Sequence, residues 1–314
     1  MRCFSVTLCC LIALAQDRPF RVQTKVVEVP VMVRDKAGQN IDGLTAGDFA
    51  VFDNGVRQQE VSLTEIGNGL APISLVVAIQ SAGTSKLALA EIRRIGGMIQ
   101  PLISGLKGEV AILSFDRDIN WLQDFTGNDD RIRSVIKGIR PGSMTGARMF
   151  DAIGEAVDRL NRRTGRKMLL LISQSNDSGS GLKFEQAVEI VDRAGIEVFA
   201  AHYSSYAMSW IAKSEDFPEK PELDAMFFSE LGRIGAPNHV KALAQSTGGA
   251  DYGFARQRGI ENAMDKMGIE VHTQYIVSFP QRDKAPGMHR IEVSLPERSG
   301  ARIRSRRVYW ADPF

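Results

Sequence analysis

The chain has 314 residues, of which 44% are hydrophobic and 24% are charged, the composition of an ordinary soluble globular protein. This length can bury a full core and can hold one large domain or two smaller ones. A formal net charge of +2 argues against a general affinity for nucleic acid or for an anionic membrane surface, so no nucleic-acid partner is expected.

The N-terminus has the pattern of a secretory signal peptide over residues 1–15. Arg2 supplies a positive charge, residues 3–15 are almost wholly apolar, and Ala13-Leu14-Ala15 matches a cleavage site. The apolar stretch is too short for a permanent membrane-spanning helix, and no second run approaches the roughly 20 residues that such a helix needs. We therefore expect an exported protein without a transmembrane segment, in the periplasm or outside the cell.

All three cysteines lie within this leader. A mature chain that begins near Gln16 would therefore contain no disulfide, no thiol nucleophile and no thiolate metal site. A lipoprotein anchored through Cys9 or Cys10 is the less favoured alternative, because Leu8 stands where such signals need a small residue.

Residues 16–68 are expected to form β-structure. Hydrophobic residues alternate from Val27 to Arg34, and the Asn54-Gly55 pair predicts a tight hairpin whose second strand covers residues 58–63. Pro30 cannot donate a backbone hydrogen bond, so its strand is expected at the edge of a sheet.

Residues 69–271 show a different pattern, in which continuous apolar strands alternate with helices. Strands are predicted over residues 73–79, 109–115, 167–173 and 196–201, and helices over residues 85–106, 129–137, 149–161, 184–194, 239–246 and 260–270. This alternation is typical of a parallel sheet that is covered on both faces through right-handed crossovers. The predicted class is α/β, with a doubly wound, mostly parallel, Rossmann-like sheet.

A long irregular segment, residues 203–236, interrupts this pattern. Segments of this length within a compact domain are usually functional loops or mobile insertions. Trp210, Phe227 and Phe228 make the segment more apolar than a simple connection requires, so they are candidate contacts with a partner. The alternative is that these side chains only cover the core.

Residues 272–314 return to β-structure, with strands predicted over residues 274–279, 289–295 and 301–309. Neither β flank alone makes a stable sheet. The N-terminal segment (residues 16–68) and the C-terminal segment (residues 272–314) are therefore expected to pack together as one small β-sandwich beside the α/β domain.

Several motifs are distinctive in their order along the chain. Leu44–Phe49 (Leu-Thr-Ala-Gly-Asp-Phe) follows the first predicted strand, Thr247-Gly248-Gly249 follows a predicted helix, and Gln274–Pro280 (Gln-Tyr-Ile-Val-Ser-Phe-Pro) opens the C-terminal flank. With these motifs, nearly all of the mature chain resembles the von Willebrand factor A-type (VWFA) related domain family of exported bacterial proteins. The resemblance implies a VWFA core with a metal-ion-dependent adhesion site (MIDAS) at the C-terminal edge of the sheet, where open α/β sheets place ligands.

The three loops that would build this site depart from the family's pattern. The first would carry Asp-x-Ser-x-Ser, but Gln80, Ala82 and Thr84 stand at these positions. The second has Ala147 in place of a liganding threonine, and the third has Gln174 in place of an aspartate. Mg²⁺ is normally held by one or two carboxylates in octahedral geometry. Because two carboxylates are replaced by neutral amides, we expect a degenerate MIDAS without a metal or another cofactor.

The rim of this degenerate site could still bind a partner directly. The candidate residues are Gln80, Ser81, Thr84, Arg148, Gln174, Asn176 and Asp177. The positive charge of Arg148 could partly replace that of the metal and pair with an acidic group of the partner. An alternative is that Asp177, Thr84 and Ser81 bind Mg²⁺ or Mn²⁺ in an altered site.

Other chemistry has little support in the sequence. The four histidines are scattered without metal-ligand spacing, and the sequence contains no nucleophile elbow, Walker A motif or Gly-x-Gly-x-x-Gly turn. The leading hypothesis is a non-catalytic, exported interaction or adhesion-type module that binds a protein or a surface polymer. The alternatives are a metal-dependent adhesion protein and a structural scaffold of the cell envelope.

Overall fold

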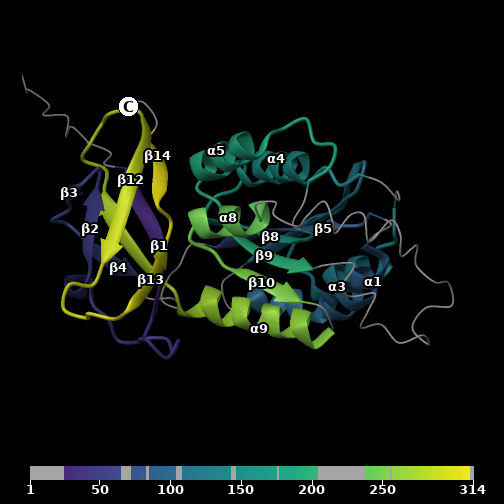
Figure 1. Ribbon diagram of the computed structural model, residues 1–314, viewed down its shortest axis with the longest axis horizontal. Helices are drawn as coiled ribbons and strands as arrows, with labels where there is room; N and C mark the ends of the chain where they lie inside the picture. Colours follow the sequence, from purple (N-terminus) through teal and green to yellow (C-terminus); the bar gives the residue numbers. More distant parts are fainter. Residues whose placement is uncertain are drawn as a thin grey trace, which may run out of the picture.

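The computed structural model describes residues 25–64, 72–82, 85–103, 108–142, 146–174, 177–203, 238–254 and 257–311. Its ribbon shows an α/β unit beside a β-sandwich (Figure 1). The α/β class with a mostly parallel sheet is confirmed, and so is a sandwich built from both flanks. The predicted leader and nearly all of the irregular segment over residues 203–236 lie outside the described residues.

The central sheet has the strand order β10-β9-β8-β5-β6-β7. Its strands are β5 (Ile73–Gln80), β6 (Glu109–Phe115), β7 (Ile119–Thr126), β8 (Arg166–Ser173), β9 (Glu197–Tyr203) and β10 (Asp251–Phe254). Every pairing is parallel except that of β7, which runs antiparallel to β6. Every residue of β5 is buried, because a central strand with helices on both faces has no side exposed to water.

Helices cover both faces of this sheet (Figure 1). One face carries α1 (Lys86–Ile92), α2 (Gly96–Ile99), α3 (Asp129–Gly138) and α9 (Gln257–Thr273), and the other carries α4 (Met149–Leu160), α5 (Phe184–Ala194) and α8 (His239–Ser246). Side chains alternate along β5, so that Ile73, Leu75, Val77 and Ile79 pack with the first group while Val76 and Ala78 pack with the second. The sheet is therefore doubly wound.

The single helix predicted over residues 85–106 is wrong. The segment is divided into α1, a 3₁₀ turn at Arg93–Ile95, α2 and a further 3₁₀ turn at Gln100–Leu102. The break coincides with Gly96, a residue of low helix propensity. A Cβ on Gly96 would lie 3.2 Å from the Cα of Arg133 in α3, so the close packing between the two helices favours glycine there.

The sandwich consists of two four-stranded antiparallel sheets, of order β13-β1-β11-β4 and β14-β12-β2-β3. The strands are β1 (Val26–Arg34), β2 (Ala50–Asp53), β3 (Val56–Arg57), β4 (Ser62–Thr64), β11 (Tyr275–Pro280), β12 (Gly287–Ser294), β13 (Arg302–Ser305) and β14 (Val308–Ala311). Each sheet contains strands from both ends of the chain. The apolar core between the sheets likewise draws on both flanks.

The hairpin at Asn54-Gly55 is confirmed, because both residues have positive φ (48° and 80°) and they join the antiparallel strands β2 and β3. Its second strand is shorter than predicted, since only Val56–Arg57 pairs with β2 while β4 belongs to the other sheet. Residues 301–309 also form two strands instead of one. The chain crosses between the sheets at Arg306-Arg307, so β13 and β14 lie in different sheets.

β1 is not the edge strand that Pro30 predicts, because it lies between β13 and β11. β13 pairs only with Val31–Arg34, so on that side the first half of β1 is outside the ladder. A proline there removes no ladder hydrogen bond on that side, which accounts for Pro30 within an interior strand.

Polar side chains join the sandwich to the α/β unit at two points. Buried Glu270 of α9 pairs with Arg34 of β1 at 2.6 Å and also with Arg304 of β13. Arg166, at the start of β8, donates a hydrogen bond of 2.6 Å to the side chain of Gln274, which directly precedes β11. Both contacts connect segments that are far apart in the sequence.

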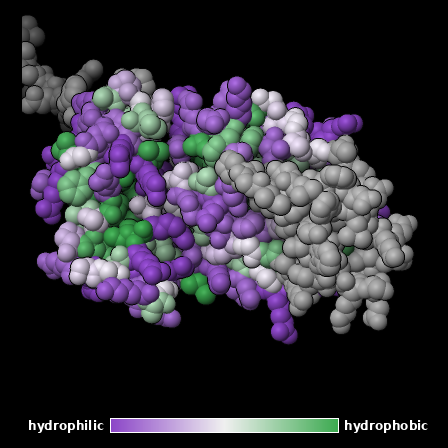
Figure 2. Space-filling model, in the orientation of Figure 1, coloured by the Kyte–Doolittle hydropathy of each residue, from purple (hydrophilic) through white to green (hydrophobic). Residues whose placement is uncertain are grey.

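The visible surface of the described residues is mainly hydrophilic, with a small apolar area over the sandwich near β12 (Figure 2). Met288 of this strand is 66% exposed, and it borders a groove of about 830 Å³ that also contacts the crossing from β13 to β14. No helix within the described ranges is long and apolar enough to cross a membrane.

Candidate functional site

The ends of β5 and β8 meet at the C-terminal edge of the sheet, where the family resemblance places the first and third loops. Ile79 pairs with Ile172 in the parallel ladder, so Gln80 and Gln174 follow at the same edge. Both side chains are buried, and the N–H of Gln174 donates a hydrogen bond of 2.8 Å to Oε1 of Gln80. The side-chain amide of Gln80, where the family pattern has an aspartate, is therefore bonded directly to the backbone of Gln174 in the third loop.

Ser81 lies against the end of β6. Its hydroxyl donates to the carbonyl of Phe115 at 3.4 Å, and its N–H donates to the same carbonyl at 2.8 Å. Its own carbonyl accepts the N–H of Gly142 at 2.7 Å, and Ala82 is buried beside it. The described start of the first loop is thus held closely against two neighbouring segments.

Asp177 stabilises the first turn of α4 from the third loop. Its Oδ1 accepts the N–H of Phe150 at 3.0 Å and the hydroxyl of Ser180 at 2.6 Å, and its Oδ2 accepts the N–H of Ser180 at 3.3 Å. Ala147 and Ser178 form an antiparallel bridge beside it, with backbone hydrogen bonds of 2.8 and 2.9 Å. The second and third loops are therefore joined by backbone contacts and by this carboxylate.

Arg148, the N-cap residue of α4, forms an ion pair with Asp151 in the first turn of that helix. Its Nε and Nη2 lie 2.9 and 2.8 Å from Oδ2 of Asp151, while the arginine side chain remains 41% exposed. Asp151 also accepts the N–H groups of Gly181 and Leu182, each at 2.9 Å. Burial raises the pKa of Asp151, but these N–H groups and Arg148 outweigh it, so the pKa lies below its ordinary value.

Asp116 is a buried carboxylate at this edge that the sequence reasoning missed. It directly follows β6, and its Oδ1 accepts the N–H of Asp118 at 2.8 Å. Its carbonyl accepts the N–H of Arg148 at 2.8 Å, and a Cβ on Gly142 would collide with its Oδ2 at 1.7 Å. Its position can be predicted from the sequence, because an acidic residue directly after an apolar parallel strand lies at the C-terminal edge of the sheet.

Mg²⁺ requires oxygen ligands in compact octahedral geometry and usually one or two carboxylates, and carboxylates described at this edge include those of Asp116 and Asp177. Gln80 and Gln174 carry no charge, and Oε1 of Gln80 already accepts a hydrogen bond. Both oxygens of Asp177 are also hydrogen-bonded. Within the described part of the chain, no three histidine, cysteine or acidic side chains are grouped as a metal site would require.

Some candidate residues lie outside the described part of the structure. These are Thr84 and Asn176 at the rim and Trp210, Phe227 and Phe228 in the irregular segment. Their contribution to a binding surface stays a prediction.

No family model and no curated protein matches the chain. Among solved structures, it is similar to the vWF domain of the type V pilus tip protein Mfa5 from Porphyromonas gingivalis (10% identity, 65% of this chain and 96% of that chain, TM-score 0.43). It is also similar to a von Willebrand factor type A protein from Catenulispora acidiphila (7%, 93% and 76%, 0.46). A third is an aerotolerance-related membrane protein from Bacteroides fragilis (12%, 64% and 100%, 0.45). The likeness concerns the fold alone.

Proposed function

We propose that the protein is a non-catalytic, exported interaction module, whose VWFA-like core binds a protein or a surface polymer without a bridging cation. The apolar leader over residues 1–15 supports export. The absence of a nucleophile elbow or a nucleotide-binding turn from the sequence supports a role in binding rather than in catalysis.

The hydrogen bond between Gln80 and the N–H of Gln174 is the observation that carries this proposal. In an adhesion site of the MIDAS type, a cation would link the first and third loops through carboxylates. Here an amide oxygen links the same two loops directly, without a charge. The edge is therefore preformed, and contact with a partner needs no metal to organise it.

Arg148 is the residue that we expect to recognise an acidic group on the partner. Its guanidinium has five N–H donors, and the pair with Asp151 uses only some of them. With 41% of the side chain exposed, the remaining donors can reach a carboxylate in a fork-like geometry.

The metal-dependent alternative would use Asp177, Thr84 and Ser81. No described contact favours it, because the carboxylate of Asp177 serves to cap α4 and the hydroxyl of Ser81 donates to Phe115. The scaffold alternative differs only in having no partner at this edge, so a capture experiment separates it from the proposal.

Thermal unfolding with and without millimolar Mg²⁺ or Mn²⁺ tests whether a cation binds. A ligand present at about 100 times its dissociation constant would add about 2.7 kcal/mol of stability, whereas we expect no shift. The triple variant Gln80→Asp, Ala82→Ser, Gln174→Asp is the positive control, and we expect it to gain cation-dependent stability. A shift of several degrees in the unaltered protein would contradict the proposal.

Capture of partners from an envelope fraction tests the binding edge. We expect the immobilised mature chain to retain the same partner with and without a chelator. Arg148→Met should weaken that capture, whereas the matched change Arg290→Met, at a 75% exposed side chain of the sandwich, should not. Equal capture by both variants would mean that Arg148 does not contribute to partner binding. Loss of capture with the chelator would favour the metal-dependent alternative.

A further inference from the structure

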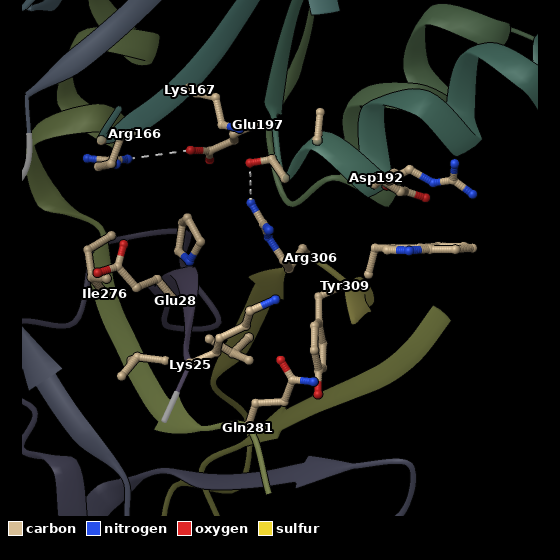
Figure 3. Close-up of a pocket in the computed structure, with 18 residues that line it drawn as sticks. Lys25, Glu28, Arg166, Lys167, Asp192, Glu197, Ile276, Gln281, Arg306 and Tyr309 are labelled. Carbon is tan, nitrogen blue, oxygen red and sulfur yellow. Dashed lines mark hydrogen bonds and ion pairs between the residues drawn. The ribbon is translucent and has the colours of Figure 1, made fainter. Parts of the chain in front are cut away.

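A cavity of about 390 Å³ lies where the sandwich meets the α/β unit (Figure 3). Its walls are the start of β8, the C-terminal end of α5, the first half of β1 and the crossing from β13 to β14. The first half of β1 contributes because β13 pairs only with Val31–Arg34 and leaves the preceding residues without a neighbouring strand on that side. The cavity is distinct from the C-terminal edge, because it adjoins the opposite ends of the parallel strands.

The side chains around this cavity carry an excess of positive charge. Three carboxylates, Glu28, Asp192 and Glu197, face a larger number of cations. The cationic side chains are those of Lys25, Arg166, Lys167, Arg193 and Arg306. Arg193 also pairs with Glu189 at 3.2 Å, so with that carboxylate included the formal excess is one positive charge.

The carboxylates neutralise these cations only in part. Glu197 is buried and already accepts hydrogen bonds from Arg166 and Gln274. Burial raises the pKa of Glu197, and it raises that of Asp192 to about 6 against the opposing effect of Arg306. These raised pKa values reflect the cost of burying a carboxylate, which the neighbouring cations reduce but do not remove.

Donors remain that no described group satisfies. Lys167 has no hydrogen-bonded or ion-paired partner among the described residues, although its side chain is half-buried. Nη1 of Arg166 and Nε of Arg306 are enclosed and have no hydrogen-bond partner. Figure 3 shows the Arg306 side chain extending from the sandwich toward the α/β unit, where it donates to the carbonyl of Gly195 at 2.8 Å. Burial and the neighbouring Arg306 both lower the pKa of Lys167, so its ammonium would gain from an anion.

We propose that this cavity binds a phosphate group, with Lys167 and Arg306 as its principal ligands and Arg166 as a supporting charge. A phosphate group carries about 1.5 to 2 negative charges at neutral pH, and its oxygens can accept hydrogen bonds from the donors of Arg166 and Arg306 that have no partner among the described residues. Guanidinium groups also match the geometry of phosphate oxygens better than that of a simple halide ion. Because Lys167 belongs to β8 and Arg306 to the sandwich, the bound group links the two parts of the molecule.

Isothermal titration of the full mature chain with inorganic phosphate tests the proposal, with sodium chloride at matched ionic strength as the reference. A second titration with glycerol phosphate distinguishes free phosphate from a phosphomonoester as the source. The variants are Lys167→Met, the conservative Lys167→Arg, and Lys241→Met as a matched change at an exposed lysine of α8. Circular dichroism of each variant checks that it is folded.

We expect saturable binding of at least one of the two phosphates by the unaltered chain and by Lys241→Met. Loss of a hydrogen bond to a charged group should weaken binding to Lys167→Met about tenfold or more. Lys167→Arg retains the charge and should bind within a few-fold of the unaltered chain. The absence of heat with either phosphate would overturn the proposal. Equal binding by Lys167→Met would also overturn it, because the effect of phosphate would then be that of a general salt.

Discussion

Gln80 illustrates how one side chain changes the chemistry of a loop edge. Its amide is one methylene longer than an aspartate and uncharged, so Oε1 reaches the backbone N–H of Gln174 and accepts its hydrogen bond at 2.8 Å. Both residues are buried, so water does not satisfy this N–H if the amide is removed. The amide thus has a structural role that the sequence alone does not indicate.

Gln80→Ala should destabilise the protein by about 1–3 kcal/mol, the usual cost of leaving a buried donor without a partner. Urea unfolding at equilibrium measures the change. Gln59→Ala, at an exposed position of the sandwich, is the matched control and should change the free energy of unfolding by less than about 0.5 kcal/mol. Equal effects of the two changes would mean that the Gln174 N–H finds another acceptor.

His289 is a second residue whose surroundings determine its charge. Its Nδ1 lies 3.0 Å from Asp53 and its Nε2 lies 2.8 Å from the carbonyl of Ala285, so both nitrogens face acceptors. The hydroxyl of Tyr309 donates to the same aspartate at 2.8 Å. Burial would lower the pKa of His289, but the Ala285 carbonyl and the Asp53 carboxylate outweigh it and raise the pKa above its ordinary value.

This arrangement predicts a pH dependence of stability. A raised histidine pKa contributes stability that is fully present below the unfolded value of about 6.5 and is lost as the pH rises through the higher folded value. The difference in unfolding free energy between the unaltered protein and His289→Gln should therefore shrink with rising pH. Urea unfolding from about pH 5.5 to about pH 9 measures it, and a difference that does not depend on pH would refute the prediction.

The sequence predicts the positions of these rim residues better than their contacts. Gln80 and Gln174 are expected at one edge because parallel strands end together. Their hydrogen bond depends on the exact register of β5 and β8, which no sequence pattern specifies. Asp177 is a candidate binding residue from its place in the third loop, yet its two oxygens cap α4 and bind Ser180, a contact between loops that local spacing cannot reveal.

At the scale of elements, the Thr247-Gly248-Gly249 motif shows why certain glycines are required. Gly248 has a φ of 85°, and a Cβ there would lie 2.5 Å from the backbone nitrogen of Arg306. A Cβ on Gly249 would lie 2.0 Å from the carbonyl of Val198. The motif therefore ends α8 and also allows the sandwich to approach the sheet closely.

Gly248→Ala and Gly38→Ala form a matched pair that separates the cost of a left-handed backbone from the cost of a steric clash. Gly38 has a φ of 84°, and a Cβ added there would meet nothing within 4 Å, so its replacement should cost only the left-handed conformation, about 1–2 kcal/mol. Gly248→Ala should cost about 1–3 kcal/mol more, because the added methyl group meets the backbone of β13. Denaturant unfolding of both variants measures this difference, and equal costs would show that the sandwich can move aside.

Several periodic elements of the α/β unit are predicted more accurately than the short strand β10. The predicted ranges for β6, α5 and α8 match the structure, and that for α4 agrees to within one residue. β10 is missed because it has only four residues, one of which is Gly253. Its strand conformation depends on pairing with β9 rather than on its own composition.

At the scale of the whole molecule, Glu270 joins the two parts of the chain. Its side chain is 1% exposed and pairs with Arg34 and Arg304, which come from opposite ends of the sequence and remain partly exposed. Removing one member of a buried ion pair costs about 3–5 kcal/mol, because the remaining charges lose their compensation.

Glu270→Ala should therefore destabilise the protein by about 3 kcal/mol, at the lower end of that range, because water can still reach the two arginines. Glu292→Ala, which removes a pair between exposed side chains in β12, should cost at most about 1 kcal/mol. Calorimetric unfolding of both variants checks the comparison. A loss at Glu270 no larger than that at Glu292 would mean that the joint adds little to stability.

The pairing of β1 means that the β-sandwich can form only after the C-terminal strands have been synthesised. β1 lies between β11 and β13, so its partners are made only after the ribosome has passed residue 275. Domains generally fold as units while the chain emerges, and the α/β unit can do so first. Until the last strands emerge, Val27, Val29, Val31 and Val33 have no sheet to join, and closing such a long loop is slow. Truncation near the C-terminus should therefore leave the beginning of the chain unfolded and prone to aggregation.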